Sequence, residues 1–319
     1  MIKESQAKNE AQNIGFKVPN INFIGNRNIA FAVAGTFILI SFVALLIRGL
    51  NFSVDFAGGT ELQVKFDEDV RSEIGKIRQV VSNLGLGTPE VKLVKAGEAE
   101  GTEMQITVKT QGDGTSVRDK ITTAFNQDLQ GKKFVVLRGE TVGPKVGKEL
   151  QSDAFKAVLF SILVILAYLA FRFKYPYGIA SVVALTHDAI ICVGFFALTG
   201  WEFSIPVLAA ILTVVAYSIN STIVIFDRVR ENIGNRALDK LSFEDIVNKS
   251  VNETLTRNII TTASTLFVVL AILFVFLASG NVLENFAVTL TIGFIAGTFS
   301  SLYIACAILV LWNKKWPIR

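Results

Sequence analysis

The stretch that decides the fold runs from Ser204 to Glu231 and reads SIPVLAAILTVVAYSINSTIVIFDRVRE. About 20 mostly apolar residues are enough to cross the hydrocarbon core of a bilayer, so Ser204–Phe226 is predicted to be a membrane helix. Polar side chains follow one line at helical spacing, namely Thr213, Tyr217 and Asn220, with Ser221 beside them. Such groups either bond neighbouring helices together or line a wet cavity, and these residues alone leave both interpretations open.

The composition points to a membrane protein that also has a polar domain. The chain has 319 residues, of which 51% are hydrophobic, more than an ordinary soluble domain has. Its formal net charge of +4 is first a topology signal in such a protein, and nucleic-acid binding is the weaker interpretation. Cys192 and Cys306 both lie in apolar runs without clustered His or Asp, so we expect neither a disulfide framework nor a metal site.

Apolar runs long enough to cross a bilayer recur along the chain. The predicted spans are Ile29–Ile47, Ala154–Phe171, Tyr177–Thr199, Ser204–Phe226, Asn258–Leu277 and Asn285–Trp312. Lys and Arg precede the first span and follow the second, fourth and sixth, whereas the loops after the third and fifth contain none. The positive-inside rule therefore predicts that both termini are cytoplasmic and that the long region after the first span lies outside.

The region between the first two spans alternates like a soluble domain. We predict strands at Thr60–Phe66, Glu90–Lys95, Glu103–Thr110 and Lys133–Thr141, and helices at Val70–Leu84 and Ser116–Leu129. The order strand–helix–strand–strand–helix–strand indicates a small α+β domain of ferredoxin-like type. The predicted organisation is a cytoplasmic segment (1–28), a first span (29–48), an extracytoplasmic domain (49–150), a five-span membrane domain (151–312) and a cytoplasmic tail (313–319).

An ionisable pair stands near the middle of the third span. His187 is the only histidine of the chain, and Asp188 follows it. A charged group at this depth costs at least about 2.5–3.5 kcal/mol, so the pair is a functional candidate. The alternative is a neutral Asp188 that is hydrogen-bonded to a neighbouring helix.

Charged residues also close the fourth span and open the fifth. The first group is predicted to form an interfacial cap, with ion pairs such as Asp227–Arg230 or Glu231–Arg228. At the start of the fifth span, Arg257 either extends to the membrane surface or acts as the counter-charge of a titrating carboxylate. The same face of this span continues with Thr261.

Other residues receive structural interpretations. Small side chains recur at every fourth position of the sixth span (Gly293, Gly297, Ser301 and Ala305), which favours close helix packing. Glu202 and Glu284, in the outer loops, are expected to be solvated. The sequence has no phosphate-binding loop and no nucleophile elbow, so we do not expect an enzyme.

Several segments together resemble the SecF family, the membrane component of the bacterial SecD–SecF protein-export complex, which is related to the resistance-nodulation-division exporters. The resembling segments are DFAGG (Asp55–Gly59), VGPKVGKEL (Val142–Leu150), THD (Thr186–Asp188), AYSINSTIVIFDRVREN (Ala216–Asn232), NETLTRNIITT (Asn252–Thr262) and FAVTLTIGFIAGTFSSLYIA (Phe286–Ala305). The family's outer-domain signature falls here on Asp55, Gly58, Gly59, Gly143 and Pro144.

The resemblance implies a multi-pass protein of the bacterial cytoplasmic membrane that promotes late-stage polypeptide export with the ion gradient. Its implied partners are SecD, the Sec translocon channel, YajC, the unfolded polypeptide in transit and membrane lipid, without nucleic acid. No cofactor is implied other than a coupling ion, a proton or sodium. Alternatives are a scaffolding subunit without its own ion path, or a small-molecule or lipid exporter.

One departure from the family matters for the mechanism. The family generally has Asp where this chain has Ser221, and that Asp faces the Arg that aligns with Arg257. Titration could rest with SecD, or it could have moved to Asp188, or Ser221 and Asn220 could bind sodium through oxygen ligands. The ion-path candidates are therefore Asp188, Asn220, Ser221, Asp227 and Arg257, supported by His187, Tyr217 and Thr261.

Overall fold

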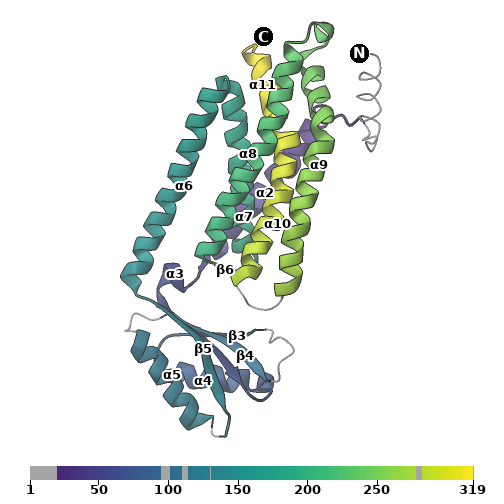
Figure 1. Cartoon of the computed structure of the whole chain (residues 1–319). Helices are drawn as coiled ribbons and strands as arrows, with labels where there is room; N and C mark the ends of the chain where they lie inside the picture. The colour runs from purple at the N-terminus through teal and green to yellow at the C-terminus, as the bar shows by residue number, and fades with distance from the viewer. Residues whose placement is uncertain (1–19, 95–100, 110–113, 130, 278–281, 319) are drawn as a thin grey trace, which may run out of the picture.

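A bundle of long helices stands on a small α/β domain in the computed structural model of the chain (Figure 1). The structure describes residues 20–94, 101–109, 114–129, 131–277 and 282–318. Within these ranges, six helical segments are long and apolar enough to cross a membrane. Both the beginning of the first long helix and the end of the last lie at the end of the bundle away from the α/β domain (Figure 1).

Each predicted span corresponds to one of these helical segments. They are α2 (Arg27–Arg48), α6 (Pro144–Arg172), α7 (Tyr175–Thr199), α8 (Ile205–Ile233), α9 (Phe243–Phe276), and a continuous sixth formed by α10 (Val282–Phe299), a π-helical segment η3 (Ser300–Ala305) and α11 (Cys306–Lys315). Helices α6 and α9 begin well before their predicted apolar runs, because Pro144 opens α6 and Ser242 caps α9 by accepting from the Asp245 backbone N–H at 3.1 Å.

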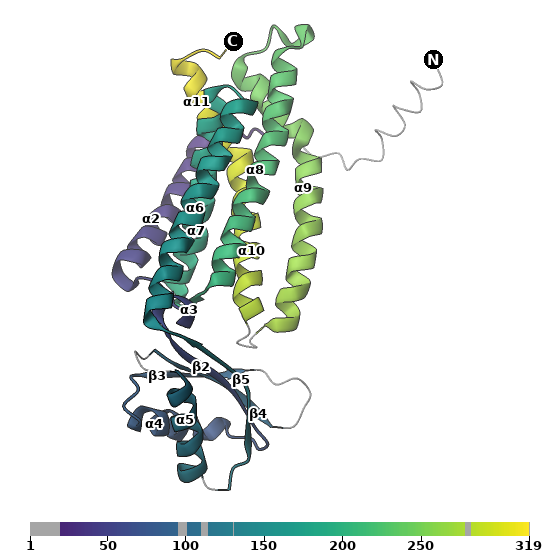
Figure 2. The same ribbon diagram turned by 60° about the vertical axis from the view of Figure 1, so that its left-hand side comes forward.

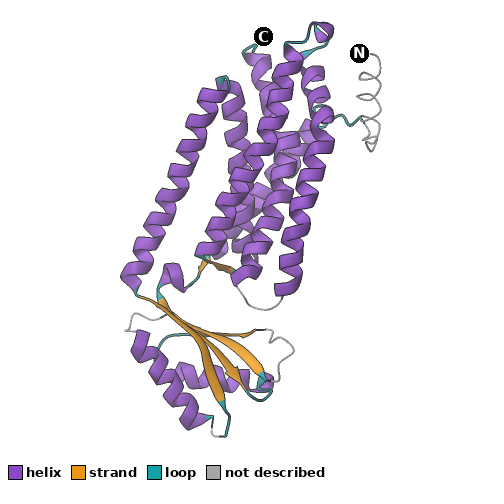
Figure 3. Cartoon of the chain, in the orientation of Figure 1, coloured by secondary structure: helices purple, strands orange, loops and turns teal. Residues whose placement is uncertain are grey.

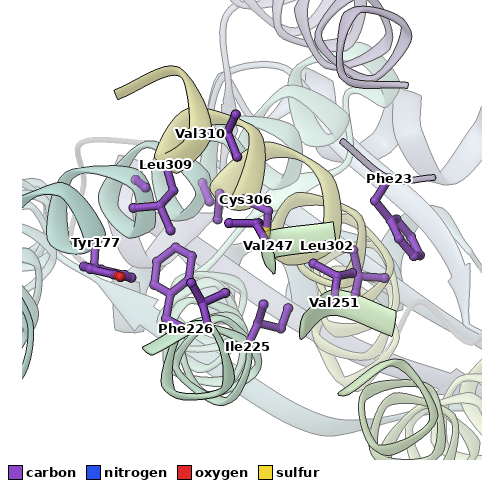
Figure 4. Close-up of a cluster of buried hydrophobic side chains, with 14 of the residues drawn as sticks. Phe23, Tyr177, Ile225, Phe226, Val247, Val251, Leu302, Cys306, Leu309 and Val310 are labelled. Atoms are coloured by element: carbon purple, nitrogen blue, oxygen red, sulfur yellow. The ribbon is translucent and has the colours of Figure 1, made fainter. Parts of the chain in front are cut away.

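The buried apolar side chains of the bundle form two clusters. One, drawn in Figure 4, lies toward the end away from the α/β domain, and the other contains Phe56, Phe203 and Phe294. The first cluster brings together side chains from five of the spans and from the segment before α2, among them Phe23, Tyr177, Ile225, Phe226, Val247, Val251, Leu302, Cys306, Leu309 and Val310. By contrast, α6 stands apart from the other helices along much of its length, and most of its side chains are exposed (Figure 1).

Glycines set the closest helix approaches in the bundle. A Cβ added at Gly293 of α10 would lie 2.1 Å from Val214 Cγ2 on α8. One added at Gly194 of α7 would lie 2.0 Å from Ser41 Oγ on α2. The sequence predicted close helix packing at Gly293, and in the structure Val214 of α8 packs against this glycine.

The α/β domain has a single four-stranded sheet with two helices on one face (Figures 2 and 3). Its elements are β2 (Gly59–Phe66), a 3₁₀ turn η1 (Arg71–Glu73), α4 (Ile74–Asn83), β3 (Pro89–Val94), β4 (Thr102–Val108), α5 (Gly114–Asp128) and β5 (Phe134–Val142). The sheet order is β3-β4-β2-β5, and each neighbouring pair is antiparallel. The chain order of strands and helices agrees with the prediction, although positions 95 and 110 of the predicted strands lie outside the described residues.

Alternating side chains build the core of this domain. Leu62, Val64 and Phe66 of β2 point to the helices and are buried, as are Met104 and Ile106 of β4. The residues between them on β2 point to the other face and are only half-buried. This period of two is the pattern from which the strands were predicted.

Three short elements join the domain to the bundle, and the sequence did not predict them. The parallel pair of β1 (Asn51–Phe52) and β6 (Glu202–Phe203) is called the ladder below. Between β1 and β2, α3 (Val54–Ala57) packs against the start of α6. A further 3₁₀ turn, η2 (Arg236–Leu238), lies between α8 and α9.

We expect Gly293→Ala to destabilise the bundle by about 1–3 kcal/mol, because the new methyl group overlaps the stiff side chain of Val214 and forces α8 and α10 apart. The measurement is the thermal unfolding midpoint in detergent. The control is Gly35→Ala in α2, where nothing lies within 4 Å of the added Cβ. The control should be neutral or stabilising, and equal midpoints for the two variants would contradict the packing role.

Candidate functional site

Asp188 lies at the centre of a buried cluster of polar side chains from three spans. Its exposed fraction is 0%. One carboxyl oxygen, Oδ2, accepts from Ser218 Oγ of α8 at 2.6 Å and from Ser300 Oγ of the sixth span at 2.8 Å. The other, Oδ1, lies 3.0 Å from Nδ1 of His187. The burial of this group in the bundle is thus matched by three polar contacts.

A second set of hydroxyls continues the cluster between α8 and the sixth span. The oxygens of Thr222 and Ser301 lie 2.9 Å apart. Both hydroxyls also lie within hydrogen-bonding distance of the Ser218 backbone carbonyl, at 3.2 Å from Thr222 and 3.3 Å from Ser301, so one of them can donate to this carbonyl while the other donates to its neighbouring hydroxyl. These hydroxyls therefore join α8 to the sixth span through the backbone of Ser218, whose side chain contacts Asp188.

The π-helical segment makes this arrangement possible. In the regular helix pattern, adjacent residues point about 100° apart, whereas Ser300 and Ser301 are both buried and both bond into the cluster. The wider turn from Ser300 to Ala305 presents both hydroxyls, and Cys306 Sγ donates to the Ser301 carbonyl at 3.4 Å. Single π-helical turns inside α-helices frequently occur at functional sites.

Gly297 lets Ser218 approach the sixth span closely, next to the carboxyl group. A Cβ at this position would lie 3.4 Å from Asp188 Oδ2 and 3.0 Å from Ser218 Cβ. The small-residue pattern of the sixth span thus has two uses, since Gly293 admits Val214 and Gly297 lies against the polar cluster. The sequence predicted helix packing for these residues, but it did not connect them with Asp188.

The cluster can hold either protonation state of Asp188. As a carboxylate, the side chain accepts from the two serine hydroxyls and from a protonated His187 Nδ1. As a carboxylic acid, it can donate from Oδ1 to an unprotonated Nδ1 while Oδ2 keeps both serine donors.

The predicted polar line of α8 and the hydroxyl residues that flank it divide between two environments. Ser218, Ser221 and Thr222 are buried, whereas Thr213 and Asn220 are exposed. Tyr217 is half-buried, and its hydroxyl lies 3.4 Å from Thr262 of α9, which in turn lies 3.1 Å from Thr298 of α10. Neither Asn220 nor Ser221 has a hydrogen-bond partner among the residues that the structure describes.

The remaining ion-path candidate on α9 does not join the cluster. Arg257 and Thr261 are both exposed. Asn258, which follows Arg257, is buried, and its Nδ2 has no acceptor within the described ranges. The structure thus brings together Asp188 and His187 but leaves Asn220 and Arg257 on the surface of the bundle.

Asp227 belongs to an ion-pair network at the end of α8. Both of its carboxyl oxygens accept from Arg172 Nη2, at 2.8 and 2.9 Å, and Oδ1 lies 3.5 Å from Arg230. Arg228 contacts Glu231 at 2.7 Å on the same helix, and a carboxylate of α9 as well. Both predicted pairs, Asp227–Arg230 and Glu231–Arg228, are confirmed.

The outer-domain signature forms the joint between the α/β domain and the bundle. Asp55 Oδ2 lies 3.4 Å from the Ile205 backbone nitrogen, which donates to it at the start of α8. Gly58 and Gly59 have φ angles of 76° and 143°, and a Cβ at Gly59 would lie 2.4 Å from the Val108 carbonyl oxygen. Gly143 and Pro144 begin α6 beside Gly58.

The expectation that Glu202 and Glu284 are simply solvated is wrong. Each has an exposed fraction of only 9%, because the α/β domain packs over the loop before α8. Glu202 Oε2 lies 3.3 Å from Lys92 of β3. The loops are short and polar in the sequence, and only the position of the neighbouring domain reveals their burial. Within the described residues, no three His, Cys, Asp or Glu side chains are placed to hold a metal ion.

Two family models match this chain. Residues 121–315 match the model described as "Protein export membrane protein SecD/SecF, C-terminal". Residues 43–70 match the model described as "SecD/SecF GG Motif". Together they cover the joint and five of the six predicted spans.

Curated relatives and solved structures agree with these models. The chain is 39% identical over 300 residues to the protein translocase subunit SecF of Calditerrivibrio nitroreducens, covering 92% of this chain and 94% of the relative. It is 36% identical over 300 residues to the SecF of Pseudomonas aeruginosa, covering 94% of each chain. The crystal structure of SecDF from Thermus thermophilus superposes with a TM-score of 0.80 at 35% identity, covering 93% of this chain and 39% of that longer chain.

We expect Asp188→Leu to destabilise the protein by about 1–3 kcal/mol, because it leaves the buried hydroxyl of Ser218 without its acceptor and removes the contact with Ser300. Asp188→Asn keeps an acceptor oxygen and should cost less. Thermal unfolding in detergent gives the comparison. The control is Thr186→Val on the same helix, whose hydroxyl bonds only within α7. Equal midpoints for Asp188→Leu and the control would show that the contacts contribute nothing.

Proposed function

The chain belongs to the SecD/SecF protein-export family and is a Sec translocation subunit, and we propose that it works with a SecD subunit. In this proposal, the pair promotes late-stage export of polypeptides across the cytoplasmic membrane by using the ion gradient. The relative from Thermus thermophilus is named SecDF, and this chain spans only 39% of its length. A relative that combines both names in one chain supports a SecD partner for this one.

The proposed orientation puts both termini in the cytoplasm and the α/β domain outside. The distribution of Lys and Arg among the loops supports it, and both described ends lie away from the α/β domain (Figure 1). The strand order β3-β4-β2-β5, with α4 and α5 on one face, supports a ferredoxin-like type for that domain.

Asp188 is the proposed coupling group of this subunit, with a proton as the ion. The observation that carries this proposal is its complete burial among hydroxyl donors from two other spans and beside His187. One charge that moves through 100 mV releases about 2.3 kcal/mol, which is enough to bias a conformational equilibrium more than tenfold. Sodium is less well supported, because Asn220 is exposed and shares no described ligand set with Ser221.

A partner helix is proposed to cover the exposed polar positions of α8 and α9. Asn220 lies within a span, and Arg257 with Thr261 lies at the start of the apolar part of α9. Polar groups that face lipid at depth are costly, so these side chains favour a protein neighbour. A SecD helix is the neighbour that we propose, and a carboxylate on it would be the natural partner of Arg257.

The other proposed partners are the Sec translocon channel, YajC, the unfolded polypeptide in transit and membrane lipid, with no nucleic acid. The role is transport and not catalysis, as the names of the translocase relatives support. The same names favour the translocase role over the small-molecule or lipid exporter.

A scaffolding subunit is the second candidate function. Ser221 favours it, since a serine cannot carry the charge of the Asp that the family generally has there. In this alternative the ion path lies entirely in SecD. The two candidates differ in whether Asp188 matters for the use of the gradient.

We expect Asp188→Asn to reduce gradient-dependent export by about tenfold or more, because the side chain keeps its shape but no longer changes charge. The measurement is late-stage export into membrane vesicles with and without an ion gradient, in the presence of SecD. The control is Asp153→Asn, which removes an exposed carboxylate that pairs with Lys156 on α6.

The scaffold predicts a different result for the same experiment. Export by Asp188→Asn would then keep its full dependence on the gradient and match Asp153→Asn. That outcome would remove Asp188 from the proposed ion path while leaving the membership in the family intact.

A further inference from the structure

Two lysines of the α/β domain contact the ladder, at the end of the bundle next to this domain. Lys92 Nζ of β3 lies 3.3 Å from Glu202 Oε2 of β6, and 2.9 Å from Glu90 on its own strand. Lys109 Nζ, just after β4, donates to Asn51 Oδ1 of β1 at 2.8 Å. Because β1 and β6 pair with each other, both contacts hold the domain to one small structural unit.

The ladder leads directly into α8. Phe203 of β6 accepts from the Ser53 backbone N–H at 3.0 Å, and α8 begins two residues later at Ile205. The Ile205 N–H donates to Asp55 Oδ2, on the chain that returns to the α/β domain. Helix α8 also carries Ser218, which donates to Asp188. A displacement of α8 along its axis would therefore reach the ladder and the lysines that contact it.

The contact of Lys92 with Glu202 occurs in a polar cavity of about 180 Å³. Its lining residues are Glu90, Lys92, Gly200, Trp201, Glu202, Glu284 and Asn285. Glu202 has an exposed fraction of 9%, and its Oε1 has no hydrogen-bond partner among the described residues. A carboxylate that is buried to this extent depends on its cationic neighbour, so separating Lys92 from Glu202 has a substantial cost.

A further carboxyl group responds to the charge of Glu202. Burial raises the pKa of Glu61 on β2 above its ordinary value of 4.5, and the charges of Glu202, Glu140 and Asp55 raise it further against a hydrogen bond with Gln105. Lys92 behaves differently: burial alone would lower its pKa, but the charges of Glu202 and Glu90 outweigh this effect and raise it.

We propose that Lys92 and Glu202 form a latch that holds the α/β domain on the ladder. If the domain leaves the ladder, the buried carboxylate of Glu202 loses its cationic neighbour, and the cost of that loss favours the seated position.

The latch does not depend on which residue binds the coupling ion. Its charged components on the α/β side are Glu61, Glu90, Lys92, Lys109 and Glu140, and on the bundle side Asp55, Glu202 and Glu284. If Asp188→Asn kept its full dependence on the gradient, the proposed latch would still stand. If the latch were overturned, the proposed role of Asp188 would still stand.

The test is a distance measurement between the two parts of the full-length protein. Spin labels on exposed positions, Lys120→Cys in α5 and Leu198→Cys at the end of α7, report how the α/β domain sits on the bundle. The native cysteines are both buried and should resist labelling. We expect Glu202→Gln to increase the population of longer distances by roughly threefold to tenfold.

The matched control is Glu68→Gln, which removes a carboxylate that pairs with Lys132 inside the α/β domain at 2.8 Å. It should leave the distances unchanged. The charge exchange Lys92→Glu with Glu202→Lys should restore the short distances that either change alone disrupts. If Glu202→Gln does not fold, Lys92→Met makes the same test from the other side. Distances like those of the control, or no restoration by the exchange, would overturn the latch.

Discussion

A carboxyl group buried inside a membrane bundle must be hydrogen-bonded, and much of this structure follows from that requirement at Asp188. Three spans contribute: α7 provides Asp188 and His187, α8 provides Ser218, and the sixth span provides Ser300. The π-helical turn and Gly297 are the local adjustments that bring the hydroxyls to the carboxyl group without steric overlap. The residues that set how closely these helices pack therefore also determine which groups contact Asp188.

Helix α8 connects this cluster with both ends of the bundle. At one end, Asp227 and Arg172 join α8 to α6 in an exposed ion-pair network. At the other, Ile205 donates to Asp55, and the ladder contacts the lysines of the α/β domain. The exposed ion pairs are individually weak, whereas the Lys92–Glu202 contact joins a half-buried lysine to a buried carboxylate and depends on the domain being seated. A change of charge should therefore destabilise the contact of Lys92 with Glu202 more than the ion pair of Asp227 with Arg172.

Much of this architecture was predictable from local patterns. The six apolar runs required helices because a spanning segment must satisfy its own backbone hydrogen bonds, and the α/β domain followed from periods of two and of 3.6 residues. The ion pairs of Asp227 and Glu231 were predictable from helical spacing. The expected solvation of Glu202 and Glu284 was wrong, because exposure depends on residues that are distant in sequence.

The sequence by itself determined the number of spans, the α/β domain between the first two, and the presence of Asp188 at membrane depth. Each of these depends on the composition or periodicity of one continuous segment. Only the tertiary structure decided that Ser218 and Ser300 meet Asp188, that Asn220 and Ser221 do not, and that Lys92 contacts Glu202. The physical reason is that hydrogen bonds and ion pairs act over a few ångströms between elements whose relative position no local pattern encodes.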